Sequence, residues 1–514
     1  MHAPKAVIEI GSTGIRLLVA DPVEDNQNKK KQFNVLDRSD QHVSIGQDVY
    51  TNGNISRETL LTCIQVLNRY KEQLASYQIE EKDTAVIATS AIREAKNRDP
   101  FVDRIKVKTG FTVRVIDGIE ENRLMYLAIT DCLKEESLDV RNTNSIIIDI
   151  SGGSTEMMLL EKGTMISAHT IRLGSVIIEQ QMKSMISTTD DIQKFIEDFI
   201  RNTANNLKAE INLENVEQFI AVSSDMRIAA LFSGMPVSPF LWEISRGSFE
   251  KFVEEIRYAP LEEIIAKFKV KFADAQTFKI ALIAYSAFLK MTNVKTIIVP
   301  ETSLREGYLL SSKKNSAAEI HDEFTDQIIA SASSLLRKYK GDAKHANFVM
   351  NTSLKLYDAM QNELGLEDSA RTLLAVSAIL HDIGVFIQAD NHNLHSKYII
   401  SNSEIFGLNR DEKNIVALIT KFHKGSLMPQ DDSEFKLLSR SSRLIILKLT
   451  AILRVADALD RGHRQNLTNY TIHLAQDTIT LRIKGYKNLS LEKIAIGQKG
   501  DLFENVFGYK IVLI

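Results

Sequence analysis

The chain has 514 residues, which is enough for three or four domains with large cores. Its 44% hydrophobic residues, 25% charged residues and 8 prolines are typical of a globular protein and exclude a largely disordered chain. The formal net charge of −3 gives no overall attraction to nucleic acid or to an anionic membrane. We therefore expect neither as a partner, and any polyanionic ligand must be met by local basic groups.

Cysteine usage and the opening residues bear on cellular location. Cys63 and Cys132 are too few for a disulfide framework and suit a reducing compartment. The opening segment MHAPKAVIEIGS lacks the cationic part and apolar core of a signal peptide, and the apolar runs are too short to span a bilayer. These features predict a cytoplasmic protein.

Residues 5–20 predict a strand, a turn of small residues and a second strand. Apolar residues run from Ala6 to Ile10, and the turn follows at Gly11 and Ser12. Glu9 lies inside the first strand, where a charge is costly to bury unless it is paired. An acid beside a glycine turn is a candidate metal or phosphate site, although a plain β-hairpin fits the same pattern.

The next predicted strand, Thr84 to Thr89, leads into a helix. Thr89 and Ser90 lie at the end of the strand, where the free N–H groups of a following helix can bind an anion. Arg93 lies one turn further and is a candidate for a bidentate phosphate contact. An ordinary helix cap with a surface arginine is the alternative.

Two adjacent acids open the helix that follows the strand Thr112 to Ile116. Glu120 and Glu121 come directly after the turn Asp117-Gly118. Carboxylates in a first turn are stabilised by the helix dipole, so both can be capping residues. The functional interpretation is a general base that faces a cleft.

Residues 145–156 repeat the N-terminal pattern. A strand from Ser145 to Ile150 is followed by the turn Ser151-Gly152-Gly153 and a second apolar run. Asp149 takes the place of Glu9, and Glu156 takes the place of Arg16. The two copies predict an internal duplication, in which each half supplies one phosphate-binding turn to a cleft between two lobes.

The later segments divide the chain into further parts. Strands and helices alternate up to about residue 310, which predicts an α/β fold. The polar stretch Ser311 to Ser316 predicts a linker, the pattern is then helical to about residue 465, and the last fifty residues read as strands. The predicted domains are a first lobe at 1–124, a second lobe at 125–312, an all-α domain at 318–465 and a small α+β, strand-rich unit at 466–514.

A second constellation lies in the helical part. His381 and Asp382 follow the apolar run LLAVSAIL, with histidines before and after them and an aspartate in RVADALD. Imidazole and carboxylate ligands suit Zn, Mn, Fe or Mg. The possible second metal site therefore comprises His345, His381, Asp382, His423 and Asp457. The alternative is that these side chains form only a hydrogen-bond network.

Six motifs along the chain resemble those of the exopolyphosphatase and guanosine pentaphosphate (pppGpp) phosphohydrolase family. They are VIEIGSTGIRLLVAD, ATSAIREAKN, VIDGIEENRL, IIIDISGGSTE, IRLGS and LREG. That family belongs to the superfamily of actin, sugar kinases and heat-shock ATPases. The resemblance implies two actin-like or sugar-kinase-like (RNase H-like) lobes. LHDIG and LRVADALDRGH resemble the HD-like domain of the family's longer members, which helps them to dimerise.

The resemblance also implies roles for single residues. Glu120 would be the base that activates the attacking water, with Glu121 as the neighbouring alternative, and Glu156 would be a second catalytic acid. Asp149 would hold Mg²⁺, with Glu9 near the metal. The residues implied in phosphate binding are Gly11, Ser12, Thr13, Thr89, Ser90, Arg93, Gly152, Gly153, Ser154 and Thr155.

This sequence departs from the family pattern at several positions. Glu9 replaces an aspartate, Ser12-Thr13-Gly14 replaces Ser-Asn-Ser, and Ser151 replaces a glycine. Ser223-Ser224-Asp225 falls where nucleotide-binding relatives have a glycine-rich turn against adenosine. The loss of those glycines argues against a snug ATP pocket, and so against a sugar kinase, and favours polyphosphate over a nucleotide.

The expected function is that of a homodimeric, Mg²⁺-dependent exopolyphosphatase that releases terminal orthophosphate from inorganic polyphosphate. One alternative is a pppGpp phosphohydrolase that uses the same cleft. Another is a metal phosphohydrolase centred on His345, His381, Asp382 and Asp457. A third is a regulator that binds polyphosphate or the alarmone without turnover.

Overall fold

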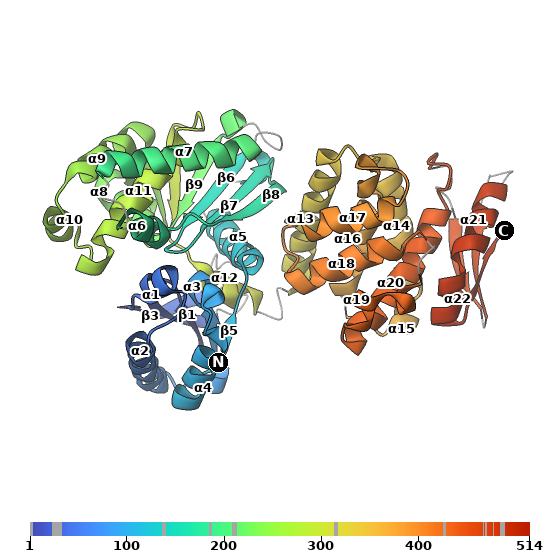
Figure 1. Ribbon diagram of the computed structural model, residues 1–514, viewed down its shortest axis with the longest axis horizontal. Helices are drawn as coiled ribbons and strands as arrows, with labels where there is room; N and C mark the ends of the chain where they lie inside the picture. The colour runs from blue at the N-terminus through green and yellow to red at the C-terminus, as the bar shows by residue number, and fades with distance from the viewer. Residues whose placement is uncertain are drawn as a thin grey trace. The chain divides into compact units, whose positions relative to one another are not determined.

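The structure is a computed structural model. It describes residues 4–22, 33–135, 140–183, 188–207, 213–312, 317–367, 369–424, 428–465, 467, 470–475, 477–483 and 489–514. The chain divides into two compact units, unit 1 (Met1–Ile320) and unit 2 (His321–Ile514), which we describe separately (Figure 1). Most of the predicted linker, at 313–316, lies outside the described residues.

The first sheet of unit 1 has the strand order β3-β2-β1-β4-β5. The central strand β1 is antiparallel to β2 and parallel to β4, and its residues Val7, Ile8 and Ile10 are fully buried. Burial on both faces explains its nearly continuous apolar run. The elements of this part are β1 (Lys5–Ile10), β2 (Gly14–Pro22), β3 (Phe33–His42), α1 (Ile45–Asn52), α2 (Arg57–Ser76), β4 (Thr84–Ala88), α3 (Ser90–Glu94), α4 (Arg98–Thr109) and β5 (Val113–Val115).

The second sheet of unit 1 has the strand order β10-β11-β12-β9-β6-β7-β8. It is mixed, and its helices complete an α/β fold, as predicted for this part of the chain. Its elements are α5 (Gly118–Glu135), β6 (Ser145–Ile150), β7 (Thr155–Glu161), β8 (Thr164–Ile171), α6 (Ser175–Lys183), α7 (Thr189–Leu207), β9 (Gln218–Val222), α8 (Ser224–Ser233), β10 (Met235–Ser238), β11 (Leu241–Ser245), α9 (Arg246–Tyr258), α10 (Leu261–Phe268), α11 (Ala275–Leu289), β12 (Thr296–Pro300) and α12 (Leu304–Ser311).

The two sheets confirm the internal duplication. The run β8-β7-β6-β9-β12 of the second sheet repeats the order β3-β2-β1-β4-β5 of the first. In the register of the first hairpin Glu9 lies opposite Arg16, and in the second Asp149 lies opposite Glu156. The correspondence read from the sequence is therefore also a correspondence of strand register.

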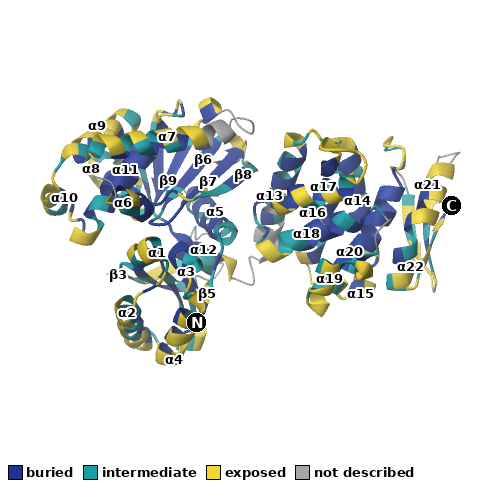
Figure 2. Ribbon diagram, in the orientation of Figure 1, coloured by how far each residue is buried: buried dark blue, intermediate teal, exposed yellow. Residues whose placement is uncertain are grey.

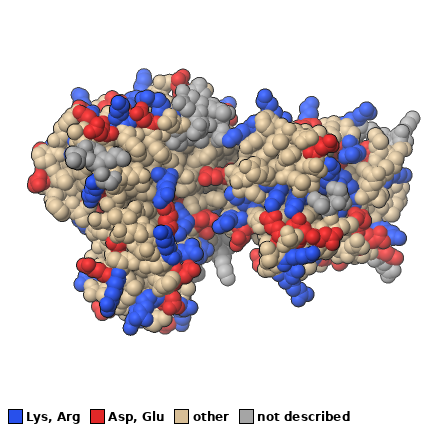
Figure 3. Space-filling view, in the orientation of Figure 1, with Lys and Arg blue, Asp and Glu red and all other residues tan. Residues whose placement is uncertain are grey.

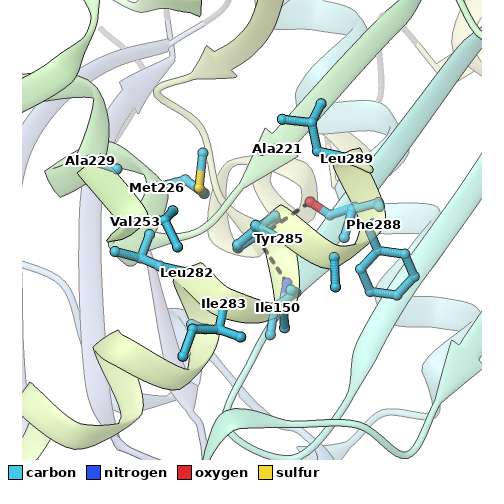
Figure 4. Close-up of a cluster of buried hydrophobic side chains, with 14 of the residues drawn as sticks. Ile150, Ala221, Met226, Ala229, Val253, Leu282, Ile283, Tyr285, Phe288 and Leu289 are labelled. Atoms are coloured by element: carbon cyan, nitrogen blue, oxygen red, sulfur yellow. Dashed lines mark hydrogen bonds between the residues drawn. The ribbon is translucent and has the colours of Figure 1, made fainter. Parts of the chain in front are cut away.

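A buried tyrosine ties the core of the second sheet to the strand ends that carry its acids. Tyr285 lies on α11, which is buried along nearly its whole length (Figure 4). Its hydroxyl donates to the carbonyl oxygen of Val222 at 2.9 Å and accepts from the N–H of Ile150 at 3.0 Å. The ends of β9 and β6 are thereby joined next to Asp149.

Unit 2 consists of a group of helices followed by a three-stranded sheet. In the sheet β13 is antiparallel and β15 is parallel to β14, with two helices in the crossover between β14 and β15. The elements are α13 (Ala317–Lys338, which begins in unit 1), α14 (Ala343–Ala359), α15 (Gln361–Leu364), α16 (Ser369–Leu380), α17 (His392–Ser401), α18 (Arg410–Phe422), α19 (Ser433–Lys436), α20 (Arg440–Ala458), β13 (Tyr470–Leu474), β14 (Thr478–Ile483), α21 (Ser490–Lys499), α22 (Asp501–Phe507) and β15 (Lys510–Leu513).

Helix α16 forms the centre of unit 2. Every residue from Thr372 to Leu380 is buried, and α16 and α20 are mostly dark blue in Figure 2. The segment Ser369–Phe386 is long and apolar enough to cross a membrane by composition, but 72% of it is buried inside the protein. Its apolarity therefore matches that of a core helix.

Some elements were not predicted from the sequence. Strand β3 is an edge strand whose residues are mostly exposed or half-buried, so it lacks an apolar signal. The short strands β10 and β11 and the helices α21 and α22 were also missed. The HD-like assignment of the helical part stays a prediction.

Candidate active site between the glycine turns

A cavity of about 290 Å³ in unit 1 is lined by both glycine turns. The first copy contributes Glu9 and the turn residues Gly11, Ser12 and Thr13. The second copy contributes Asp149, Glu156 and the turn residues Ser151 and Gly152. Helix α5 adds Glu121, and the end of β4 adds Thr89. The structure thus brings the two predicted turns to one cleft.

The two turns approach each other closely. A Cβ atom added to Gly152 would lie 2.8 Å from the Cβ of Ser12, so the second turn has no room for a side chain there. The Oγ of Ser12 lies 3.1 Å from the hydroxyl of Tyr50 and 3.3 Å from the Oγ of Ser90. These hydroxyl contacts fix the first turn, and the small residues leave backbone groups free to contact a ligand.

Four carboxylates of the cleft hold protons more tightly than usual, and in one of them, Asp225, burial raises the pKa to about 6. Burial raises the pKa of Glu121 to about 7, although the charge of Arg93 opposes this shift. The pKa of Asp149 is raised to about 8 because the cleft removes it from bulk water and because Glu9 and Glu121 lie nearby. Burial and the charges of Glu121 and Asp149 raise the pKa of Glu156 well above its ordinary value.

These carboxylates fit a divalent cation. The Oε1 atom of Glu156 is buried and has no hydrogen-bond partner among the described residues. Asp149 lies opposite it in the hairpin register, and both side chains line the cavity. Mg²⁺ prefers oxygen ligands, and a cation relieves the repulsion between carboxylates that lie close together. Asp149 and Glu156 are therefore the residues that would hold such an ion.

Glu9 has a different environment from the one expected of a metal ligand. Its carboxylate lies 3.5 Å from Nη1 of Arg16 and 3.4 Å from Nη1 of Arg305. Arg16 lies in turn 3.6 Å from Asp40. The charge of Glu9 is thus already balanced by two guanidinium groups, which distinguishes the first copy from the second.

The structure separates the two adjacent glutamates of α5. Glu121 is buried, lines the cavity and forms an ion pair with Arg93. Glu120 is absent from the cavity lining and pairs with Arg114 instead. Successive residues of a helix point about 100° apart, so only one of the two can face the cleft. This geometry favours Glu121 over Glu120 as the candidate base.

Several predicted phosphate ligands support the cavity without lining it. Arg93 donates to Glu121 and, at 2.8 Å, to the carbonyl oxygen of Ile116. The hydroxyl of Thr155 donates to the carbonyl oxygen of Leu173 at 2.5 Å. The predicted phosphate ligands that do not line the cavity are Ser90, Arg93, Gly153, Ser154 and Thr155. The helix that follows Thr89, α3, is only five residues long.

The basic side chains that line the cavity were not predicted from the sequence as site residues. They are Arg16, Arg227, Lys269, Lys271 and Arg305. On the face drawn in Figure 3, Lys and Arg are interspersed with Asp and Glu, so this face offers no single basic area. Burial and the charge of Arg305 lower the pKa of Arg227, as expected for cations crowded where an anion would bind.

Signals for two of these residues were present in the sequence. Arg16 takes the place of Glu156 in the duplication, and Arg305 belongs to the LREG motif. The lysines follow no motif and reach the cavity only through the fold. His42, Asp225 and Asp274 also line it and were not predicted.

The predicted histidine and aspartate cluster of unit 2 also assembles. His345, His381, Asp382, His423 and Asp457 lie in overlapping groups whose ligand atoms are within 4.8 Å of one another. Two further histidines lie beside this cluster. His463 forms a group with His345 and Asp382, and Nε2 of His392 lies 3.1 Å from Oδ1 of Asp382. The signal for His392 in the sequence is its position beside a second histidine, His395, shortly after His381 and Asp382.

Comparisons with known proteins agree with both units. The model of the Ppx/GppA phosphatase family matches residues 23–316, and that of Ppx/GppA phosphatase, domain III, matches residues 329–498. The guanosine-5'-triphosphate,3'-diphosphate pyrophosphatase of Photobacterium profundum is 22% identical over 485 residues, which cover 93% of this chain and 91% of that protein. The protein of the same name from Aliivibrio fischeri (strain MJ11) is 22% identical over 487 residues, with the same coverage.

A solved structure shares the fold. The exopolyphosphatase from Cytophaga hutchinsonii matches with a TM-score of 0.53 and 20% identity, over 60% of this chain and 97% of that one. The first family model alone covers more than half of the 514 residues, so the chain belongs to the Ppx/GppA phosphatase family.

Proposed function

We propose that the protein hydrolyses terminal phosphoanhydride bonds in the cleft of unit 1 and releases orthophosphate from inorganic polyphosphate. The observation that carries this proposal is the meeting of two glycine turns, four carboxylates of raised pKa and five basic side chains around one cavity. Phosphoanhydride hydrolysis needs these parts, namely groups that position the phosphoryl oxygens, groups that balance their charge, and a base for water.

Glu121 is the proposed general base. Its pKa of about 7 lets its carboxylate take a proton from water near neutral pH, where an ordinary glutamate is a weaker base. Arg93 fixes its orientation from the side of α3. The backbone of the turns at Gly11 and Gly152 would hold the oxygens of the terminal phosphate.

Asp149 and Glu156 are the proposed cation ligands, and Mg²⁺ is the proposed cation. When bound there, Mg²⁺ would balance the negative charge of the phosphoryl oxygens. The two carboxylates would hold it in the same cavity as the basic side chains, so both could balance the charge of the ligand. Removal of divalent cations with a chelator is therefore expected to abolish turnover, and added Mg²⁺ to restore it.

The basic side chains favour a polyanionic leaving group. Arg227, Lys269, Lys271 and Arg305 line the cavity together with Ser223 and Asp225, where nucleotide-binding relatives have a glycine-rich turn. Ser223 uses its side chain to cap α8, accepting from the N–H of Met226 at 3.0 Å. This wall presents cations to phosphate groups.

A pppGpp phosphohydrolase is the second candidate. Relatives with that printed activity align over 93% of this chain, which favours it. The same cleft and the same base would serve, and only the leaving group would differ. Initial rates of orthophosphate release from polyphosphate and from pppGpp, measured side by side with Mg²⁺, separate the two. A higher kcat/KM for pppGpp would overturn our first choice of substrate.

The first test compares Glu121→Gln with Glu120→Gln. We expect phosphate release from long-chain polyphosphate to fall about a hundredfold for Glu121→Gln, as loss of a general base predicts. Glu120→Gln serves as the matched control and is expected to stay close to wild type, because its side chain pairs with Arg114 outside the cavity. Equal losses in both variants, or a loss only in Glu120→Gln, would contradict the assignment.

The remaining alternatives have distinct outcomes. A metal phosphohydrolase centred on unit 2 predicts that His381→Ala loses phosphate release and that Glu121→Gln keeps it. A binding-only regulator predicts tight binding of polyphosphate without turnover by wild type. The homodimer and the cytoplasmic location stay proposals, and the molar mass from light scattering tests the first.

A further inference from the structure

The first residues of three described helices line the cavity of unit 1. They are Ser175 of α6, Ser224 of α8 and Leu304 of α12. The N–H groups in the first turn of a helix have no partner within that helix, so they are satisfied from outside or remain available to a ligand. The three helix starts differ in this respect.

The starts of α6 and α8 are already in use. The N–H of Val176 in α6 donates to the carbonyl oxygen of Gly152 at 2.9 Å, so this helix holds the second glycine turn. In α8 the N–H of Met226 donates to the side chain of Ser223 at 3.0 Å, and Asp225 adds a negative charge to the first turn. Neither start is available to an anion.

The start of α12 is open. Ser303 at the N-cap position forms no capping hydrogen bond, and its hydroxyl donates instead to the carboxylate of Glu306, which Arg38 balances at 2.7 Å. The N–H groups of Leu304 and Arg305 form no hydrogen bond with a described residue. These free donors and the dipole of α12 favour an anion in the cavity.

Arg305 is a second and independent indication of an anion at this place. The residue is 7% exposed and lines the cavity, and its Nε has no hydrogen-bond partner among the described residues. A buried donor without a partner is destabilising, and more so when it carries charge. The hydroxyl of Thr302, a cavity-lining residue that is 5% exposed, also lacks a partner in the described part of the chain. Phosphate oxygens accept from both kinds of donor.

Glu9 holds the other end of this guanidinium loosely. Nη1 of Arg305 lies 3.4 Å from Oε2 of Glu9, which is longer than the roughly 3.2 Å limit of a good N–H···O hydrogen bond. Oε1 of the same carboxylate lies 3.5 Å from Nη1 of Arg16, so one acid is shared between two cations. A phosphate group close to Arg305 would therefore compete with Glu9 for it.

The duplication places this helix start beside the helix that carries the proposed base. Strand β12 takes the position of β5 in the repeated sheet order, so α12 is the counterpart of α5. The two helices cross closely (Figure 1), and a Cβ atom added to Gly307 would lie 1.9 Å from the carbonyl oxygen of Leu124. This crossing fixes the start of α12, with Arg305, relative to the helix that carries Glu121.

We propose that the start of α12, with Arg305 and Thr302, is a second phosphate subsite that holds a phosphate group of the leaving chain while the terminal phosphate lies at the glycine turns. The inference rests on the function proposed for the cleft and adds the residues that hold a part of the substrate that is not cleaved. A ligand fills both subsites only if it has at least two linked phosphate groups.

The test is the binding of imidodiphosphate, whose P–N–P link resists hydrolysis, to the full chain at a fixed Mg²⁺ concentration. Isothermal titration calorimetry gives the affinity. Arg305→Met is expected to weaken binding by about tenfold or more, because a charged donor is lost, and Arg305→Lys by less, because it keeps the charge. Arg246→Met is the matched control, since Arg246 pairs with Glu250 and does not line the cavity, and it should bind like wild type.

Glu9→Gln is expected to give a change of the opposite sign, which a misfolded protein would not produce. Loss of the carboxylate frees Nη1 of Arg305, so imidodiphosphate should bind about threefold more tightly or better. In the double variant Glu9→Gln with Arg305→Met this gain should be lost, because both changes act through one guanidinium. The same gain with and without Arg305 would overturn its assigned role.

A crystal structure with imidodiphosphate locates the two phosphate groups. One within hydrogen-bond distance of Arg305 and the other at the glycine turns would support the proposal, and both away from Arg305 would overturn it. Circular dichroism checks the fold of each variant. Unchanged affinity in folded Arg305→Met would also overturn the subsite, and if that variant does not fold, Arg305→Lys and Glu9→Gln decide.

Kinetics separate a failure of the subsite from a failure of the proposed function. Arg305→Met should raise KM for polyphosphate about tenfold or more and lower kcat far less, because a group that is bound equally in the ground state and the transition state affects mainly KM. Wild type that binds imidodiphosphate through Arg305 but releases no orthophosphate would refute the function and support the subsite. Turnover with unchanged KM and unchanged imidodiphosphate affinity in Arg305→Met would refute the subsite and leave the function in place.

Discussion

Arg93 and Glu121 form an ion pair whose members act at different points of the cleft. Glu121 lines the cavity, whereas Arg93 lies behind it and also holds the carbonyl oxygen of Ile116. The charge of Arg93 lowers the pKa of Glu121 against the larger effect of burial. Arg93 is therefore a positioning residue that also sets the pH at which the proposed base becomes active.

Replacing Arg93 is expected to shift the pH profile. In Arg93→Met the pKa of Glu121 rises, because the nearby positive charge is lost, so the ascending limb of kcat/KM moves to higher pH by about one unit or more. Measurement of kcat/KM from acid to alkaline pH checks this. Arg114→Met, which removes the partner of Glu120 outside the cavity, is the control and should leave the limb in place. A lower rate with no shift would mean that Arg93 acts only on structure.

The glycine turns depend on the close approach of two backbone segments from the two sheets. Gly152 faces Ser12 of the first turn, and Gly174 lies against the carbonyl oxygen of Gly152. Neither position has space for a side chain. The distance between the turns, and so the width of the phosphate site, is set by the absence of these Cβ atoms.

Gly152→Ala is expected to damage the site more than the fold. The added methyl would lie 2.8 Å from the Cβ of Ser12, so one turn must move, and a displacement near the chemistry reduces kcat by about a hundredfold. Gly247→Ala on α9 is the control, because its Cβ would contact nothing within 4 Å. That change should raise stability by roughly 0.5 to 1 kcal/mol in chemical denaturation and leave the rate unchanged. Full activity of Gly152→Ala would show that the turns are not in contact with the substrate.

The protonation of the cleft is coupled to the stability of the whole unit. Glu121 and Asp149 have folded-state pKa values of about 7 and about 8, above the ordinary values of 4.5 and 3.8 that the unfolded chain retains. Between about pH 4 and about pH 8 the folded state therefore binds more protons than the unfolded state. Stability is therefore greatest below about pH 4 with respect to these groups and is lost as the pH rises to about 8.

Without divalent cations, the melting temperature of unit 1 is expected to fall by several degrees between pH 5 and pH 8.5 for this reason. Excess Mg²⁺ at the higher pH should recover most of the loss, because a bound cation replaces the protons. Differential scanning calorimetry in chelator and in Mg²⁺ checks both statements. The double variant Glu121→Gln with Asp149→Asn should flatten the pH dependence. A profile that rises with pH in wild type would refute the assigned pKa shifts.

Much of unit 1 could be predicted because its central strands are apolar on both faces and its acids recur at matching positions. The duplication, the α/β fold and the meeting of the turns follow from that pattern. Whether Glu120 or Glu121 faces the cleft could not be predicted in this way. It depends on the residue at which α5 begins, because a shift of one residue rotates each side chain by about 100° around the helix axis. Lys269 and Lys271 could not be predicted, since only the fold brings them to the cavity.

The two copies of the duplicated hairpin differ in the charge of their facing side chains. In the first, Glu9 faces Arg16 and the pair is neutral, whereas in the second Asp149 faces Glu156 and the ionised pair would carry two negative charges. The cleft is therefore nearly symmetric in backbone and asymmetric in charge. This asymmetry would give a linear polyanion one direction of entry, with the end to be cleaved near Asp149 and Glu156 and the remainder toward the arginines and lysines.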